Sequence, residues 1–279
     1  MIIDKTLHLV EINHKGECYM TQQRSLAIIT GASSGLGFEM AKLFAKDGYD
    51  LAITGSSDRI FEAAETIREL GVEAYPHKAD AAAYEGVEGF WDFVSDLDRP
   101  VEAAVLNVGI GIGGGSFLET SLEDEMRLIS INITGTVHLA KRVVHHMVPN
   151  SRGKILIVSS ISATTPTPYE TVYGPSKAFG FAFAESLREE LRETGVTVTA
   201  LLPGATDTNF HANAGMGDTQ IGSSSKNDKE LVAKQGYEAL MNDIDHVVGG
   251  DEKTKKEAED NRTTSETEKA AIHAEKTRP

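Results

Sequence analysis

Residues 25–37 read SLAIITGASSGLG, an apolar, β-branched run that leads directly into a glycine-rich turn. Residues 38–46 follow with apolar side chains at helical spacing. This order of strand, turn and helix predicts the first βα unit of a parallel sheet. Glycines at 31, 35 and 37 allow a tight turn and a close approach to an anion. A helix N-terminus at this point offers free N–H groups to a phosphate, so the turn predicts dinucleotide binding.

The same alternation continues to about residue 249. Strand-like apolar segments occupy residues 25–30, 50–54, 72–77, 101–106, 154–159, 196–202 and 246–248. Segments with helical spacing lie between them, the longest at 122–148. Apolar strands between amphipathic helices are typical of a parallel sheet covered on both faces. We therefore expect an α/β, doubly wound, Rossmann-like catalytic domain over residues 24–250, with about seven strands.

Two segments fall outside this pattern. Residues 1–23 are an N-terminal extension, for which we consider disorder, an arm, or a leader that precedes a native start at Met20. Residues 251–279 are rich in Glu, Lys and Thr, and Ser265 followed by Glu268 resembles a capping box. The composition favours a solvated, partly helical tail over a cover for the active site.

The composition excludes several classes of protein. The formal net charge of −15 argues against nucleic acid and against anionic membrane surfaces as partners. The apolar runs fall short of the roughly 18 residues that a membrane span needs. Cys18 is the only cysteine, which fits a reduced, cytoplasmic compartment. His145 and His146 are adjacent and point apart on a helix, and no ligand pattern completes a metal site, so we expect none.

Four polar residues stand in an order that indicates chemistry. Tyr173 and Lys177 are four residues apart, so a helix places them on one face, and Pro175 between them fits only a first helical turn. Ser160 ends the fifth strand, at the sheet edge where doubly wound folds bind ligands. Asn132 falls inside the long helix, where asparagine is unfavourable unless it has a hydrogen-bonding role.

The Thr-Gly-x-x-x-Gly-x-Gly turn and these four residues resemble the short-chain dehydrogenase/reductase family, in its single-domain branch. The resemblance implies hydride transfer between nicotinamide C4 and a carbonyl or secondary alcohol. Tyr173 would be the acid/base and Ser160 would orient the substrate oxygen. Lys177 would bind ribose and, with the nicotinamide charge, lower a phenol pKa that is ordinarily about 10. Asn132 would hold a relay water.

The second strand bears on the choice of cofactor. No acidic residue stands at its end, where Thr54 falls, which favours NADP over NAD. Asp58, and Gly55 where the family usually has arginine, count against NADP. The predicted cofactor contacts are Gly31, Ser33, Ser34, Gly35, Leu36, Gly37, Thr54, Ser56, Arg59, Asp80, Ala81, Asn107, Gly109, Tyr173, Lys177, Pro203, Gly204, Thr206 and Thr208.

The substrate is expected to be a small or medium, fairly apolar ketone, aldehyde or secondary alcohol. The expected walls, residues 109–116 and 162–169, hold no lysine or arginine. Residues 210–227 are long enough for a lid, with Phe210 and Met216 as candidates to close it. The resemblance also implies a homodimer or homotetramer. The alternative function is a dinucleotide-binding regulator or scaffold that lacks turnover; an enoyl reductase is disfavoured because that group usually spaces its Tyr and Lys more widely.

Overall fold

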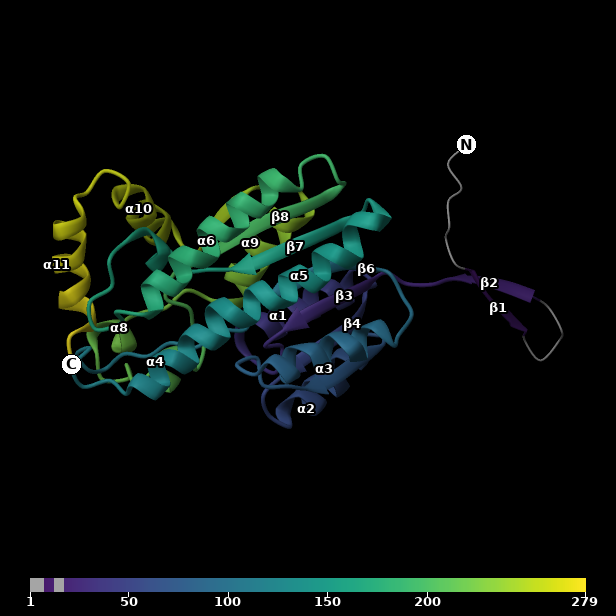
Figure 1. Cartoon of the computed structure of the whole chain (residues 1–279), viewed down its shortest axis with the longest axis horizontal. Helices are drawn as coiled ribbons and strands as arrows, with labels where there is room; N and C mark the ends of the chain where they lie inside the picture. The colour runs from purple at the N-terminus through teal and green to yellow at the C-terminus, as the bar shows by residue number, and fades with distance from the viewer. Residues whose placement is uncertain (1–7, 13–17) are drawn as a thin grey trace.

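The computed structural model describes residues 8–12 and 18–279, with side chains from residue 23 onward. Its centre is a parallel sheet with the strand order β5-β4-β3-β6-β7-β8-β9 (Figure 1). These strands are β3 (Leu26–Thr30), β4 (Asp50–Gly55), β5 (Ala74–Lys78), β6 (Val101–Leu106), β7 (Gly153–Val158), β8 (Val196–Pro203) and β9 (His246–Gly249). The prediction of a doubly wound, Rossmann-like sheet of about seven strands is confirmed. The strand order reverses between β3 and β6, and ligands bind at the carboxyl ends beside such a reversal.

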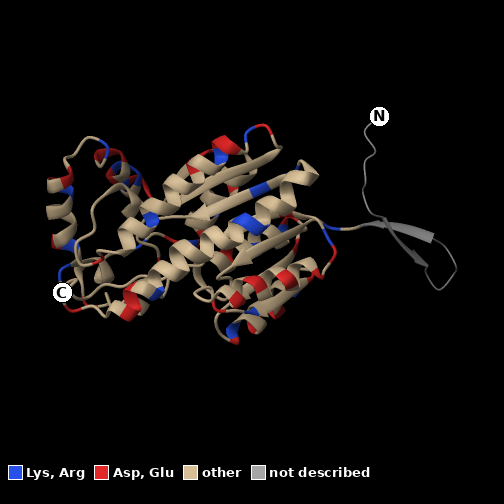
Figure 2. Cartoon of the chain, in the orientation of Figure 1, with Lys and Arg blue, Asp and Glu red and all other residues tan. Residues whose placement is uncertain are grey.

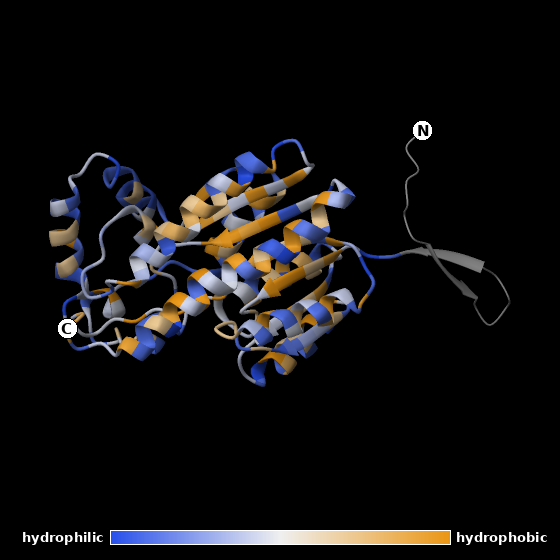
Figure 3. Cartoon of the chain, viewed as in Figure 1, coloured by the Kyte–Doolittle hydropathy of each residue, from blue (hydrophilic) through white to orange (hydrophobic). Residues whose placement is uncertain are grey.

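Helices cover both faces of the sheet. On one face lie α1 (Gly35–Lys46), α2 (Arg59–Arg68) and α9 (Lys229–Met241). On the other lie α3 (Tyr84–Ser95), α5 (Thr136–Met147) and α6 (Tyr173–Glu190). Figure 3 shows the apolar strands between these helices, and Figure 2 shows that most charged residues lie on helices and loops around the sheet. None of the described helices is long and apolar enough to cross a membrane.

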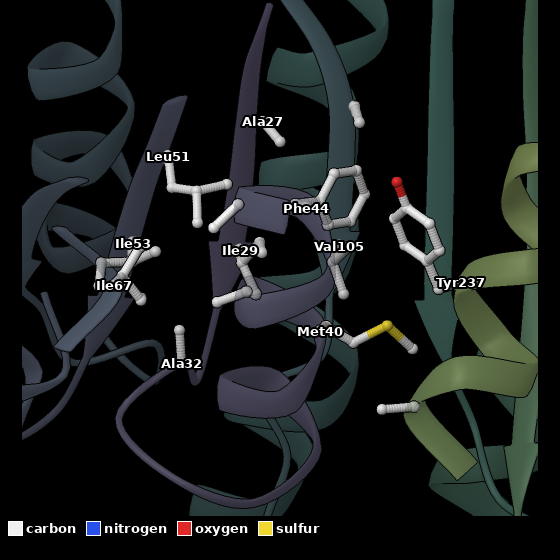
Figure 4. Packing of buried hydrophobic residues seen from close by; sticks show 14 of the residues in the cluster. Ala27, Ile29, Ala32, Met40, Phe44, Leu51, Ile53, Ile67, Val105 and Tyr237 are labelled. Carbon is white, nitrogen blue, oxygen red and sulfur yellow. The ribbon is translucent and has the colours of Figure 1, made fainter. Parts of the chain in front are cut away.

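The core beneath α1 shows why β3 has no polar residue before Thr30. Ala27 and Ile29 face α1, whereas Leu26 and Ile28 belong to the cluster on the opposite face. In the α1 layer the ring of Phe44 meets Tyr237 edge-on, with 4.8 Å between ring centroids (Figure 4). A strand buried on both faces holds the glycine turn rigidly above it.

The long helix predicted over 122–148 is interrupted. Residues Leu122–Ile129 form α4, a π-helical turn spans Ser130–Gly135, and α5 follows. A π turn inserts one extra residue into the helix and is frequent at functional sites. Here the turn contains Asn132.

The two ends of the chain add elements outside the sheet. Residues His8–Ile12 (β1) and Cys18–Gln22 (β2) pair as antiparallel strands. Residues 1–7 and 13–17, which belong to the predicted N-terminal extension, lie outside the described residues. At the other end, Glu252–Asp260 (α10) and Glu266–Thr277 (α11) are helical (Figure 1).

The C-terminal helices do not form the solvated tail that their composition suggested. Thr277 is fully buried and donates a hydrogen bond to the carbonyl of Pro168 at 2.8 Å. Lys269 donates to the carbonyl of Thr164 at 3.1 Å. These polar contacts hold α11 against the loop that leads from β7 to α6, so the tail packs on one wall of the candidate site.

Candidate active site

The glycine turn between β3 and α1 has the shape of an anion cradle. Gly31 and Gly35 adopt φ values of +65° and +60°, in the left-handed region that favours glycine. A Cβ on Gly37 would lie 2.4 Å from the carbonyl oxygen of Gly31, so only glycine fits there. Ser34 precedes α1 and its side chain makes no capping hydrogen bond. The first N–H groups of α1 therefore remain available to a phosphate.

Asn107 ties this turn to the end of β6. Its side-chain amide donates to the carbonyl of Thr30 at 2.9 Å and to that of Gly31 at 3.3 Å. The hydroxyl of Thr30 accepts from the backbone N–H groups of Asn107 and Val108. These bonds fix the turn, so Asn107 is mainly structural here.

A cavity of about 180 Å³, called the Thr54 cavity, lies at the ends of β4 and β5. Thr54, Asp80 and Ser56 line it, and the buried hydroxyl of Thr54 has no partner among the described residues. Asp80 accepts from the backbone of Ala82 and from both terminal nitrogens of Arg127, which holds the pKa of Asp80 below its usual value.

The acidic residue in the short segment between β4 and α2, Asp58, forms an ion pair. The carboxylate of Asp58 lies 2.9 Å from the ammonium of Lys78 at the end of β5. Among the described residues, the guanidinium of Arg59 donates a hydrogen bond only to the hydroxyl of Ser57, at 3.5 Å. The positive charge of Arg59 is thus not neutralised by its sequence neighbour Asp58.

A second cavity of about 260 Å³, called the Tyr173 cavity, runs from the glycine turn to α6. Ser160, Tyr173 and Lys177 all line it and all are buried. The ammonium of Lys177 donates to the carbonyl of Val158 at 3.1 Å and lies 5.8 Å from the centre of the Tyr173 ring. Ser160 accepts from the N–H of Ser162 at 3.1 Å. The strand end and the first turn of α6 thereby bring a hydroxyl, a phenol and an amine together.

The electrostatics of this cluster differ from the prediction. Burial raises the pKa of Tyr173 above its ordinary value, the charge of Glu170 raises it further, and a hydrogen bond with Ser160 opposes them. Burial lowers the pKa of Lys177 to about 8. Lys177 was expected to lower the phenol pKa, but among this chain's own groups burial and Glu170 dominate.

Asn132 lies outside the cavity lining and holds residues next to the cluster. Its Oδ1 accepts from the N–H of Ile110, and its Nδ2 donates to the carbonyl of Ile110 and to the hydroxyl of Ser176, all at 2.9–3.0 Å. A Cβ on Gly109 would lie 2.9 Å from the ammonium of Lys177 and 3.3 Å from Oδ1 of Asn132. The π turn therefore places the Asn132 amide close to Lys177.

The turn after β8 closes the cavity opposite the glycine turn. Thr206 donates to the carbonyl of Gly204 at 2.8 Å, and the hydroxyl of Thr208 accepts from the N–H of Phe210 at 3.2 Å. A Cβ on Gly35 would lie 3.3 Å from the Thr208 methyl group. The Phe210 ring lies 5.2 Å from that of Tyr173, between centroids.

Most predicted site residues line one of these two cavities. The Tyr173 cavity includes Gly31, Ser34, Gly35, Leu36, Asn107, Gly109, Ser160, Tyr173, Lys177, Pro203, Gly204, Thr206 and Thr208. The Thr54 cavity includes Gly31, Ser33, Thr54, Ser56, Asp80 and Ala81. The linings of both cavities lack Gly37, Arg59 and Asn132. Gly37 and Asn132 lie behind the linings, where they hold the loops in place.

Sequence reasoning missed three residues. Glu170 and His211 also line the Tyr173 cavity, and His273 of α11 contacts Glu170. Glu170 stands just beyond the predicted wall 162–169, and its position three residues before Tyr173 was the one local signal. His273 is 103 residues away from Glu170 in the sequence, and no local pattern connects them.

A cluster at the start of β9 is separate from both cavities. Glu185, Asp245 and His246 each place one potential ligand atom within 4.8 Å of the others. The His246 ring lies 3.3 Å from the carboxylate of Glu185 and 3.1 Å from that of Asp245. Because all three are at least partly exposed, we interpret the group as a surface ion-pair cluster.

The fold and the two cavities define a dinucleotide-binding type of α/β protein with a Ser, Tyr and Lys cluster beside the cradle. A family model described as short chain dehydrogenase matches residues 25–218. The chain belongs to the short-chain dehydrogenase/reductase family.

Individual relatives agree with this assignment. The probable oxidoreductase EphD of Mycobacterium tuberculosis H37Rv is 35% identical over 193 residues, which are 68% of this chain and 32% of that protein. The chain thus spans about a third of the length of that relative. Glucose 1-dehydrogenase 2 of Bacillus subtilis is 32% identical over 188 residues, 66% of this chain and 73% of its own.

A solved short-chain dehydrogenase from Sphingobium yanoikuyae in complex with NADPH has a TM-score of 0.75 and 26% identity. The match covers 80% of this chain and 87% of that one. A family member from Burkholderia phymatum in complex with NAD, at 22% identity, has a TM-score of 0.74, covering 81% of this chain and 89% of that one.

Proposed function

We propose that this chain is an NAD(P)-dependent oxidoreductase that transfers hydride between nicotinamide C4 and a carbonyl or secondary alcohol. The observation that carries the proposal is the shared lining of the Tyr173 cavity. Ser160, Tyr173 and Lys177 open onto the same space as the glycine turn, so a dinucleotide held by its phosphates would reach the cluster. The names of the solved relatives, with NADPH or NAD, support this class of cofactor.

The residues present fit such a cofactor. Gly31 and Gly35 form a left-handed turn where α1 begins, and a Cβ on them would crowd Asn107 and Thr208, respectively. The buried hydroxyl of Thr54, which has no partner among the described residues, lies at the end of β4, where doubly wound folds bind an adenosine ribose. Lys177 would bind the ribose next to the nicotinamide, and Thr208 would contact the carboxamide. When bound, the cofactor supplies or accepts the hydride.

Tyr173 acts as the general acid and base. In reduction its hydroxyl donates a proton to the substrate oxygen, and in oxidation it removes one. Burial and Glu170 keep that proton on the phenol until transfer, so Tyr173 carries the proton that reduction requires. Lys177, with a pKa of about 8, is mostly protonated at that pH and stabilises the phenolate that remains.

Ser160 and Asn132 position the reacting groups. The hydroxyl of Ser160 hydrogen-bonds the substrate oxygen that receives the proton. Asn132 fixes the backbone of Ile110 and the hydroxyl of Ser176. From this position its amide would also hold a water that links Lys177 to solvent.

NADP is the preferred cofactor in this proposal, with NAD as the alternative. Thr54, Ser56 and Arg59 would contact the 2′-phosphate, and Asp58 is neutralised by Lys78. The ratio of kcat/KM for NADPH to that for NADH checks the preference. A ratio well below one would reverse it.

The proposal also covers the partners of the chain, its oligomeric state and its location in the cell. The partner is a small-molecule carbonyl or alcohol, and neither nucleic acid nor a membrane is expected for a chain of net charge −15. Exposed apolar side chains on α4 and α6, among them Leu122, Met126 and Phe179, would be covered in a homodimer or homotetramer. The proposed location is the cytoplasm.

The experiment that tests the function is a panel of ketones, aldehydes and secondary alcohols assayed with each cofactor. Turnover of at least one substrate supports the oxidoreductase. Cofactor binding without turnover across the panel would favour the regulator or scaffold instead, which needs the cradle but not the Tyr–Lys pair.

A further inference from the structure

Two buried polar side chains in the Tyr173 cavity do not contact the reacting atoms of the proposed hydride transfer, although the charge of one of them, Glu170, raises the pKa of Tyr173. Glu170 is 3% exposed and lies in the loop three residues before α6, and His211 is 8% exposed and lies in α7 (Phe210–Asn213). Both line the cavity together with Tyr173. Burying a carboxylate is costly unless it is hydrogen-bonded, so its presence in this wall requires a partner.

His273 of α11 is that partner on one side. Its Nε2 lies 3.0 Å from Oε2 of Glu170, and both side chains are buried. The backbone of Glu170 is held as well, because its carbonyl accepts from the Thr167 hydroxyl and from the N–H of Gly174. The other carboxylate oxygen, Oε1, has no hydrogen-bond partner among the described residues. Glu170 is therefore fixed in orientation with one oxygen still able to accept.

The position of His273 is set by the docking of α11. Lys269, one turn before it, donates to the carbonyl of Thr164, and Thr277, one turn after it, donates to that of Pro168. The C-terminal helix thus acts on the Tyr173 cavity indirectly, through the contact of His273 with Glu170.

His211 offers the second unmet polar group. Its ring makes no hydrogen bond to any described residue, and its Nδ1 is buried. Burial and the nearby Lys226 lower the pKa of His211, against a smaller opposite effect of Glu170, so the ring is neutral near pH 7. A neutral imidazole carries one donor and one acceptor. A buried polar atom without a partner in a cavity wall needs one, and a polar group of a bound ligand can supply it.

A hydroxyl group matches both side chains. It donates its one O–H to the carboxylate and accepts a hydrogen bond from the N–H of the neutral imidazole, whereas an ammonium cannot accept one. A carboxylate or phosphate on the substrate would be repelled by Glu170. These two side chains are therefore suited to a neutral substrate that carries a hydroxyl in addition to its reacting oxygen.

We propose that Glu170 and His211 form a subsite for a second hydroxyl group of the substrate, and that His273 positions Glu170 for this contact. The inference rests on the proposed function and names its substrate class: hydroxy ketones in reduction and diols in oxidation. It revises the expectation of a fairly apolar substrate, which rested on walls without lysine or arginine.

The test compares four alcohols with the full chain and its preferred cofactor: 2-butanol, 2,3-butanediol, 1,3-butanediol and 3-amino-2-butanol. The wild type is expected to show a higher kcat/KM for at least one diol than for 2-butanol. The nearly isosteric Glu170→Gln variant keeps an acceptor for His273 and turns an amide NH₂ toward the cavity. We expect it to lower the diol-to-butanol selectivity at least about 10-fold, which corresponds to about 1.4 kcal/mol.

The selectivity ratio separates substrate binding from proton transfer. Because Glu170 also raises the pKa of Tyr173, Glu170→Gln will change the rate with every substrate, and the ratio cancels that common effect. His211→Phe provides a second variant that removes the imidazole and keeps a ring. This variant should lower the same selectivity ratio. Its thermal unfolding midpoint should equal that of the wild type, which shows that it is folded.

The positioning role of His273 has its own matched control. His273→Ala should reduce the selectivity by roughly 3- to 10-fold, and His273→Gln, which retains a donor, should restore most of it. Glu257→Gln removes a different ion pair of the tail, between Glu257 and Lys276 at 2.7 Å, and neither residue lines the Tyr173 cavity. It should leave the selectivity unchanged.

The possible outcomes distinguish a failure of the proposed subsite from a failure of the proposed function. Turnover of 2-butanol with no preference for either diol, or unchanged selectivity in both Glu170→Gln and His211→Phe, would overturn the subsite while the proposed function stands. A preference for 3-amino-2-butanol over the diols would overturn the hydroxyl assignment. No oxidation of any alcohol, and no reduction in the wider carbonyl panel, would contradict the proposed function itself and the subsite with it.

Discussion

Replacing Gly37 by alanine should damage the phosphate cradle more than any other single methyl group added there. The new Cβ would lie 2.4 Å from the carbonyl oxygen of Gly31 and 2.6 Å from Nδ2 of Asn107. Real Cβ contacts essentially never fall below 3.0 Å, so both groups must move by at least about half an ångström. Overpacking of this kind costs about 1–3 kcal/mol, and a strained Asn107 hydrogen bond adds about 1 kcal/mol.

The expected loss of unfolding free energy is therefore about 2–4 kcal/mol, measured by urea denaturation. Cofactor affinity should fall at least about 10-fold, because the displaced Gly31 carbonyl alters the turn that holds the phosphates; NADPH fluorescence titration measures it. Gly180→Ala in α6 is the matched control. Its Cβ would meet its nearest described neighbour at 3.9 Å, so it should gain about 0.5–1 kcal/mol from helix propensity. Wild-type stability and NADPH affinity in Gly37→Ala would refute the reasoning.

Three further predictions follow from other parts of the chain. Arg59→Ala should lower the NADPH-to-NADH ratio of kcat/KM by roughly 5- to 10-fold, because an exposed cation near the 2′-phosphate is lost; an unchanged ratio would remove Arg59 from the site. Between pH 8 and 10.5 the unfolded chain keeps a proton on Lys177 that the folded chain has lost. As the pH rises through this window, the unfolding free energy of the wild type should therefore increase by up to about 3 kcal/mol relative to that of Lys177→Met. A difference in urea denaturation that does not change with pH would contradict this prediction. Thr277→Val should cost about 1 kcal/mol and speed hydrogen exchange in α11, because the bond to Pro168 is lost; exchange at the wild-type rate would argue that the contact does not hold the tail.

The fold was predictable because its information is local. β-Branched apolar runs such as 25–30 and 196–202 identify strands that are buried on both faces, and glycines 31, 35 and 37 mark a turn that no other residue could form. The π turn was not predictable from periodicity. Asn132 makes its hydrogen bonds to Ile110 and Ser176, which are brought near only by the folded sheet.

The candidate site was predictable to the extent that it follows strand ends and helix starts. Ser160 ends a strand and Tyr173 begins a helix, so the topology brings them to one cavity. The contacts of the tail depend instead on pairs about 100 residues apart, such as Lys269 with Thr164 and His273 with Glu170. A composition rich in Glu, Lys and Thr is typical of a solvated segment, and it conceals the few polar side chains that dock.

The measurement that tests the central claim most directly is the rate of NADPH oxidation with a carbonyl substrate in wild type and in Tyr173→Phe. The variant removes the proton donor and leaves the ring between Phe210 and Lys177, so cofactor affinity should stay within about 2-fold. The account predicts that kcat falls by about 10²–10⁴-fold, the usual contribution of a general acid. Near-normal turnover in Tyr173→Phe would contradict it.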